Sequence, residues 1–272
     1  FDALRHLGTL SRWAADPEGS RRYGQQAFDA AREIGRKDLM SWAANAVADA
    51  YLWQSELDRA AEVAAEALEL AEESGGIVPR GQALHALGQV AEENGDHAEA
   101  VRLYERSLAL FAEAGAALDH ARTINHFAEL LMDLGEDERA EDLVRETIRT
   151  LKPLGDRGYL CETQRVLAEL LLRRGKVDEA EGYALEAIRT VGPEDIISLA
   201  TTRKSLGLVR EAQGRDDEAE ALLREAVELA DRAPPWIYNA HVETLARFLA
   251  AHGRAEEASG LEPRTGWLAS AE

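Results

Sequence analysis

The chain has 272 residues and a formal net charge of −20, from 31 Lys and Arg residues against 51 Asp and Glu residues. An acidic surface of this kind repels phosphate backbones and anionic lipids, which argues against nucleic acid or a membrane as a direct partner. The single cysteine, Cys161, excludes an internal disulfide and is compatible with a reducing compartment such as the cytoplasm.

The first eighty residues predict two helix pairs. The chain begins at Phe1 rather than Met, which suggests a piece of a longer protein. A helix is expected to begin near Pro17, because proline is tolerated in the first turn of a helix. The next helix begins at Ser41 and carries three large aromatic residues, and its partner at 56–73 has a strongly acidic outer face.

The stretch 80–115 predicts two helices joined by a tight turn. Its first half spaces apolar residues three and four apart, with Gly88 beside them as a notch for close packing. An Asn-Gly pair ending at Gly95 terminates this helix, because glycine readily adopts the left-handed conformation common at helix ends. Asp96, three residues before Glu99, resembles a capping box that starts the second helix.

This pattern recurs about every forty residues. Units that begin near positions 1, 41, 81, 121, 161, 200 and 239 have small residues at their eighth and twentieth positions. The eighth positions are Gly8, Ala48, Gly88, Ala128, Ala168, Gly207 and Ala246, and the twentieth are Ser20, Ala60, Ala100, Ala140, Ala180, Ala219 and Ala258. Small residues that face each other, such as Gly88 and Ala100, let the paired helices approach closely.

The later units are predicted with similar bounds. Their helices are expected at 119–134 and 136–151, at 159–174 and 177–190, and at 196–213 and 216–232. Half of a seventh unit follows, with one helix at 236–252 and a short one at 255–260. The remaining residues, 261–272, are predicted to form an irregular tail in which Trp267 folds back over the last apolar groove.

A known helix-turn-helix signature is present in order as Leu87, Gly88, Gly95, Ala100 and Tyr104. The chain therefore resembles the tetratricopeptide repeat family over nearly its whole length. The usual repeat of that family has about 34 residues, so the forty-residue period marks a variety with longer helices. Gln164 and Arg203 depart from the pattern, since a large apolar residue is expected at both positions.

The resemblance implies an all-α fold, a right-handed superhelical solenoid of helix-turn-helix repeats with about 13 helices. Each repeat of such a solenoid contacts only its neighbours, so the whole chain, 1–272, is expected to form a single domain. No segment approaches ~18 uninterrupted apolar residues, and no transmembrane helix is expected.

The sequence lacks the phosphate-cradling, dinucleotide and common zinc motifs. His120 and His126 are six residues apart and share a helical face poorly, which favours solvated or hydrogen-bonded histidines over metal ligands. The abundant carboxylates favour a solvated acidic face over acid–base catalysis. Cys161 opens a helix whose dipole could lower the thiol pKa, but no histidine neighbours it in sequence. We therefore predict no enzymatic activity, no metal and no cofactor.

The resemblance also implies where a partner would bind. In tetratricopeptide arrays the first helix of each unit lines the concave side, with positions 2, 5, 9, 12 and 13 pointing into it. The fifth positions are then Arg5, Asn45, His85, Asn125, Arg165, Lys204 and Glu243. We expect Asn45, His85, Asn125 and Arg165 to grip the backbone of an extended or helical peptide with their hydrogen-bonding groups. The alternative is that these residues are polar only because water covers them.

Other concave positions supply aromatic and charged candidates. They include Trp42, Trp53, Asp49, Gln89, Arg122 and Glu129. Tryptophans in clefts anchor partners, although they serve equally well in packing the end of an array. The floor of the groove is acidic through Glu92, Glu93, Glu129, Asp133 and Glu169, relieved by Arg122, Arg165 and Arg173. A basic partner segment is therefore expected.

Three classes of function remain open. The leading one is a non-enzymatic scaffold that binds a protein or peptide along the concave face. The alternative is the C-terminal ligand- or peptide-sensing domain of a larger bacterial protein, because the period and composition resemble the superhelices of signal-transduction ATPases and maltose-regulator-like transcription activators. The third, an enzyme, is supported by no residue. The identity of the partner and the oligomeric state do not follow from the sequence.

Overall fold

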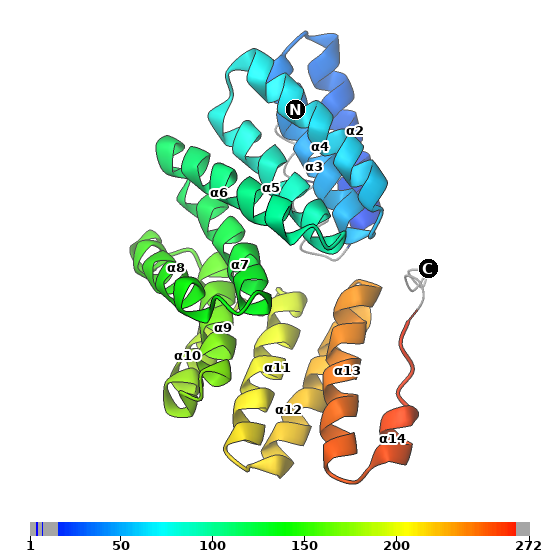
Figure 1. The fold of residues 1–272 in the computed structure, drawn as a ribbon. Helices are drawn as coiled ribbons and strands as arrows, with labels where there is room; N and C mark the ends of the chain where they lie inside the picture. The colour runs from blue at the N-terminus through cyan, green and yellow to red at the C-terminus, as the bar shows by residue number, and fades with distance from the viewer. Residues whose placement is uncertain (1–3, 5–6, 8–15, 265–272) are drawn as a thin grey trace. The chain divides into compact units, whose positions relative to one another are not determined.

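The computed structural model describes residues 4, 7 and 16–264, and within them it contains 13 α-helices, two short 3₁₀ helices and no strand (Figure 1). The predicted all-α fold of consecutive helix pairs is confirmed. Apart from residues 4 and 7, which are helical, the first helix of the first repeat lies outside the described residues, as does the predicted lid formed by Trp267. The chain divides into two compact units, 1–135 and 136–272. Its behaviour as one continuous domain stays a prediction.

Within the first compact unit, residues 16–135 form six helices joined by turns of two or three residues. They are α2 (Pro17–Glu33), α3 (Lys37–Trp53), α4 (Leu57–Ser74), α5 (Ile77–Glu93), α6 (His97–Ala114) and α7 (Ala117–Asp133). The pairs α3 with α4 and α5 with α6 pack most extensively, and α5 also contacts α3 and α7. The first helices of successive repeats therefore form a layer of their own.

The turns of the reference repeat follow the predicted chemistry. Gly95 and Gly115 adopt left-handed conformations, with φ of 77° and 64°, which residues with a Cβ rarely populate. The N–H of Glu99 donates to Asp96 Oδ1 at 3.3 Å, so the predicted cap is present. The Glu99 side chain pairs with Arg102 instead of closing the capping box.

Helix α5 begins at Ile77, three residues before the predicted start. Pro79 lies buried in its first turn. The N–H groups of a first turn have no intrahelical acceptor, so a proline there leaves no hydrogen bond unmade. Pro79 consequently belongs to the helix.

Most of the small residues at the described repeat positions are buried, whereas Ala246 and Ala258 of the last repeat are only partly buried. Fully or nearly fully buried are Ala48, Ala60, Ala100, Ala128, Ala140, Ala168, Ala180 and Ala219. Gly88 differs from the prediction in its neighbour. A Cβ on Gly88 would lie 2.8 Å from Cε1 of Tyr104, so the notch makes room for this aromatic ring more directly than for Ala100.

The second unit continues the pattern of helix pairs. It contains α8 (Asp137–Leu151), η1 (Lys152–Leu154), α9 (Gly158–Arg173), α10 (Val177–Thr190), α11 (Ile196–Ala212), α12 (Asp216–Leu229), η2 (Ala230–Arg232), α13 (Pro235–Ala251) and α14 (Ala255–Ser259). The bounds of α10 are those predicted, and the other helices differ by only a few residues. The pairs α9 with α10 and α11 with α12 pack most extensively in this unit.

Gln164 and Arg203, the two polar residues that depart from the repeat pattern, each pair with a glutamate. Gln164 is buried and donates from Nε2 to Glu186 Oε2 at 3.0 Å. Arg203 donates from Nε to Glu225 Oε1 at 2.9 Å. Each acceptor lies 22 residues further along the chain, on the second helix of the same repeat. A polar cross-link between paired helices thus takes the place of an apolar contact.

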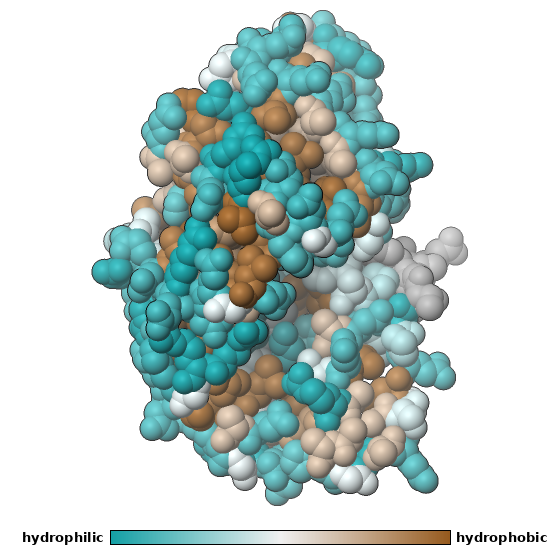
Figure 2. All heavy atoms as spheres, in the orientation of Figure 1, coloured by the Kyte–Doolittle hydropathy of each residue, from teal (hydrophilic) through white to brown (hydrophobic). Residues whose placement is uncertain are grey.

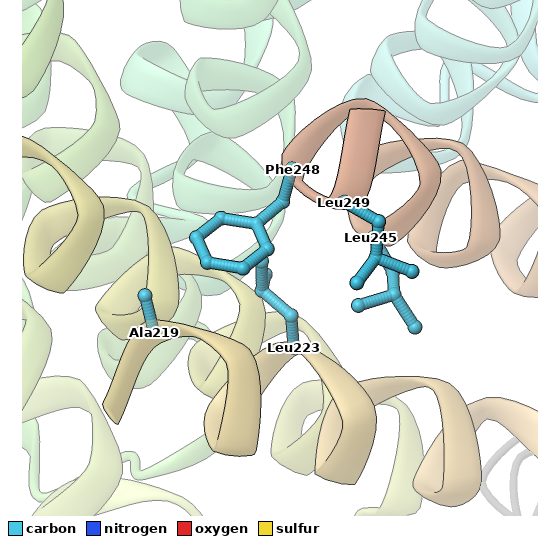
Figure 3. Packing of buried hydrophobic residues seen from close by; sticks show 5 residues of the cluster. All are labelled: Ala219, Leu223, Leu245, Phe248 and Leu249. Atoms are coloured by element: carbon cyan, nitrogen blue, oxygen red, sulfur yellow. The ribbon is translucent and has the colours of Figure 1, made fainter. Parts of the chain in front are cut away.

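The last helix pair is incomplete, because α14 has five residues whereas α10 and α12 each have 14. The core beside it consists of Ala219, Leu223, Leu245, Phe248 and Leu249. Figure 3 shows these side chains meeting between α12 and α13, with the Phe248 ring facing α12. Ala258 and Leu261 pack against this cluster in place of a full second helix.

Candidate partner-binding surface

The predicted column of fifth-position side chains is buried. Asn45, His85, Asn125 and Arg165 have relative exposures of 5%, 0%, 9% and 7%. They therefore lie beneath the surface and do not form an open row of hydrogen-bonding groups. Their role in binding a partner stays a prediction, and the structure shows what several of them do within the fold.

Asn45 holds two helices together. Its Nδ2 donates to the carbonyl oxygen of Pro79 at 2.9 Å, and this bond joins α3 to the first turn of α5. That carbonyl lies at a helix start, and the side-chain donor reaches it from the preceding repeat. Replacement of Asn45 by alanine would leave a buried acceptor without this donor, so this change is expected to lower the stability of the fold.

His85 belongs to a buried polar and aromatic group between α5, α6 and α7. Thr123 Oγ1 lies 3.0 Å from His85 Nδ1. The His85 ring centroid lies 5.2 Å from that of His126 and 5.8 Å from that of Tyr104. His85 thus connects three helices of the first unit, which is a packing role whether or not a partner approaches it.

Asp49 and Gln89, each at the ninth position of its repeat, pair with residues on the first helix of a later repeat. Arg122 Nη1 donates to Asp49 Oδ2 at 2.8 Å, with side-chain exposures of 14% and 21%. The pair connects α7 to α3, two repeats away, and so spans α5. Gln89 Nε2 lies 3.4 Å from His126 Nε2 and connects α5 to α7. The surface of this layer is therefore fixed by contacts between repeats.

The C-terminal ends of α5 and α7 carry carboxylates. Tyr104 donates its hydroxyl to Glu92 Oε2 at 2.6 Å. Burial raises the pKa of Glu92 to about 7, against the opposing effect of the Tyr104 hydrogen bond and with a further contribution from the charges of Glu129, Glu93 and Asp133. A positive charge placed here would stabilise the ionised form of Glu92.

Trp42 and Trp53 are both partly exposed and both belong to α3, Trp42 in its second turn and Trp53 as its last residue. We group them with the polar and charged residues of the first helices named above, whose assignment to one partner-binding face stays a prediction. We call this set the first-helix surface. It consists of Trp42, Asp49, Trp53, Gln89, Glu92, Glu93, Arg122, Glu129 and Asp133.

The second unit has a charged cluster at the equivalent positions. Arg165 Nε donates to Glu162 Oε2 at 3.0 Å, and its Nη1 lies 3.2 Å from Glu169 Oε1. Burial acts to raise the pKa of Glu169, but the nearby charges of Lys204 and Arg165 outweigh it and lower that pKa. Arg165 is therefore engaged by carboxylates of its own helix.

The prediction that the helix dipole lowers the pKa of the Cys161 thiol was wrong in direction. Cys161 is buried, and burial raises its pKa to about 12, so the thiolate needed for nucleophilic chemistry is disfavoured. Among the described residues, no group of three or more His, Cys, Asp or Glu side chains is placed to hold a metal ion. In the same part of the chain, no helix combines the length and apolar character needed to cross a membrane.

The site contains features that the repeat pattern did not indicate. The pair of Tyr104 with Glu92 and the pair of Gln164 with Glu186 both join the two helices of one repeat. Each pair lies at a helix-crossing position where the pattern specifies only an aromatic or an apolar residue. A polar residue at such a position is the one sequence signal that could have pointed to them.

Consecutive helix hairpins with small buried residues at their crossing points define the class of α-helical repeat proteins. A family model described as the tetratricopeptide repeat matches residues 79–152 and 159–232, which is more than half of the chain. The chain belongs to the tetratricopeptide repeat family.

Several solved structures share this fold. BtubC from P. vanneervenii is 20% identical, with a TM-score of 0.62 over 94% of this chain and 97% of that chain. The apo form of RapI is 13% identical, with a TM-score of 0.66 over 93% of this chain and 92% of that chain. Aspartyl phosphate phosphatase F from Bacillus subtilis is 13% identical, with a TM-score of 0.63 over 93% of this chain and 66% of that chain. Among curated proteins, no sequence matches this chain.

Proposed function

We propose that this chain is a non-enzymatic scaffold that binds a protein or peptide through its first-helix surface. The observation that carries the proposal is the organisation of that surface. Asp49 and Arg122 join helices two repeats apart, so the side chains around them are held in place before any partner arrives. A preorganised surface loses little conformational freedom on binding, which favours affinity.

The charge of the surface indicates the chemistry of the partner. Glu93, Glu129 and Asp133 lie close enough for their charges to act together on Glu92. The whole chain carries a formal charge of −20. Figure 2 shows mostly hydrophilic side chains with apolar patches between them on the face drawn. We therefore propose a protein or peptide partner with a basic segment, and neither nucleic acid nor a membrane surface.

The proposal assigns different roles to the buried and the accessible residues. Asn45 and His85 hold neighbouring first helices together beneath the surface. Asn125 is buried as well, and Arg165 pairs with carboxylates of its own helix. Trp42 and Trp53 supply the apolar anchors, because partly buried aromatic side chains lose less entropy on binding than flexible ones. The proposed location is the cytoplasm, since the single cysteine suits a reducing compartment.

The test compares two pairs of substitutions. A partner captured from a cell extract on the immobilised chain is purified and titrated against variants by calorimetry. Trp42→Ala with Trp53→Ala is expected to weaken binding by about tenfold or more, as for interface anchors worth at least ~1.4 kcal/mol. Glu66→Lys with Glu69→Lys on α4 is the control. Unchanged affinity for the tryptophan pair, with a large loss for the α4 pair, would refute the assignment.

A further inference from the structure

The segment that follows α14 lies against α13 and is held there by specific contacts. We call residues 260–264 the strap. Figure 1 shows it running back alongside α13 from the short α14. Leu261 packs against the apolar cluster between α12 and α13. The strap thus covers part of the face that a complete second helix covers in the other repeats.

One side chain binds the backbone of the strap. Asn239 Nδ2 donates to the carbonyl oxygen of Arg264 at 2.9 Å, and the N–H of Arg264 donates to Asn239 Oδ1 at 2.7 Å. A single amide side chain therefore satisfies both backbone groups of one residue. An extended peptide is recognised in this way without regard to its side chain at that position.

The side chain of Arg264 has a site of its own. Its guanidinium carbon lies 3.6 Å from the centroid of the Tyr238 ring. Its Nη1 and Nη2 groups donate to the carbonyl oxygen and the carboxylate of Asp231, respectively. The Arg264 side chain is only 18% exposed. Stacking on an aromatic face together with forked donation to oxygen atoms is specific to arginine.

The sequence of the strap favours an extended conformation before it docks. Pro263 fixes its own φ near −65° and disfavours the helical conformation at Glu262. A segment with these restrictions loses little entropy on binding. The recognised features are then a leucine, two residues that keep the chain extended, and an arginine.

We propose that Asp231, Tyr238 and Asn239, with the neighbouring apolar cluster, form a binding site for extended peptides of the pattern Leu-x-x-Arg. The strap occupies this site as an intramolecular ligand. The site goes beyond the function proposed above and shares no residue with the first-helix surface. Its ligand class is a protein segment that supplies an apolar side chain three residues before an arginine.

The strap competes with any peptide from another chain for this site. A short tether gives a local concentration on the order of millimolar, so the strap excludes a weak peptide from the unmodified chain. Release of the strap opens the site to a peptide with the same features. Binding in trans should therefore rise when the strap is weakened, and this rise should depend on Asn239.

The first experiment measures this competition. The probe is a fluorescein-labelled peptide with the sequence of residues 258–266, and the readout is anisotropy. The full chain with Leu261→Ala and Arg264→Ala is expected to bind the probe at least about tenfold more tightly than the unmodified chain. Asn239→Ala added to this variant should abolish the gain, as should Arg264→Gln in the probe. Equal binding to both chains, no binding to the opened chain, or a gain that survives Asn239→Ala would overturn the proposal.

A second measurement uses the strap in place and does not require the opened chain to fold. Amide hydrogen exchange at Arg264 should be at least about tenfold faster in Asn239→Ala than in the unmodified chain, because the N–H loses its acceptor. Exchange in α10 should be unchanged, which checks that the fold is intact. An unchanged rate at Arg264 would show that Asn239 does not hold the strap and would overturn the proposal.

Discussion

At the scale of single residues, Glu92 places a carboxylate where the fold disfavours its charge. It is largely buried, lies near three other carboxylates, and accepts a hydrogen bond from Tyr104. Its pKa rises from 4.5 to about 7. The protonated form is thus stabilised in the folded chain relative to the unfolded chain.

This shift predicts a stability that falls with pH. The stabilising contribution is complete below pH 4.5 and is lost as the pH rises through 7, because the unfolded chain ionises first. The full difference is on the order of 3 kcal/mol. Glu92→Gln keeps an acceptor for Tyr104 and cannot ionise. Urea unfolding should therefore show similar stability of the two proteins near pH 4 and a more stable glutamine variant at pH 8.

The control for this prediction is Glu113→Gln, an exposed position on α6. It removes the same formal charge without a buried carboxylate. If Glu113→Gln raised stability at pH 8 as much as Glu92→Gln, the effect would come from the net charge of the chain and not from the environment of Glu92.

At the scale of helices, Gly88 and Gly182 both lie within α-helices but differ in how closely other side chains approach them. A Cβ on Gly88 in α5 would lie 2.8 and 2.9 Å from two atoms of the buried Tyr104 ring. A Cβ on Gly182 in α10 would meet no atom within 4 Å. The first glycine is required by packing, and the second costs its helix stability without any packing gain.

Alanine substitutions at these two glycines should therefore differ in sign. Gly182→Ala is expected to stabilise the chain by up to ~1 kcal/mol through helix propensity. Gly88→Ala should lower stability, because overpacking typically costs ~1–3 kcal/mol and outweighs that gain. Thermal unfolding followed by circular dichroism measures both. Stabilisation by Gly88→Ala would mean that Tyr104 can move and that the notch is not a packing requirement.

The repeat pattern predicts much of the fold because helix bounds depend on residues close in sequence. Asp96 and Gly95 set the start and end of adjacent helices through local hydrogen bonds and backbone conformation. The site was less predictable. Asn45 donates to a carbonyl group 34 residues away, and Asn239 binds a backbone 25 residues away. Such pairs depend on how neighbouring helices pack, which the pattern of one repeat does not specify.

At the scale of the whole molecule, each compact unit contains helix pairs with their own buried residues. In the second unit, Gly207 of α11 has the role that Gly88 has in α5, because a Cβ on Gly207 would lie 2.9 Å from Leu223. A sensing domain within a larger regulator stays a prediction of the sequence. A sensing domain would bind its ligand at the same first-helix surface. How far the effect of binding spreads along the chain would depend on how strongly the stability of one repeat is coupled to that of the next.

In repeat proteins, stability is approximately a sum of repeat and nearest-neighbour terms, so a defect should remain local. Gly88→Leu and Gly207→Leu introduce the same overpacking into the two units, each at a typical cost of ~1–3 kcal/mol. We expect hydrogen exchange measured by mass spectrometry to accelerate mainly in α5 and α6 for Gly88→Leu, and mainly in α11 and α12 for Gly207→Leu. Each variant is the control for the other, since the substitution is identical and only its position differs. Equal acceleration of all helices by either variant would contradict local coupling and would support unfolding of the chain 1–272 as one cooperative domain.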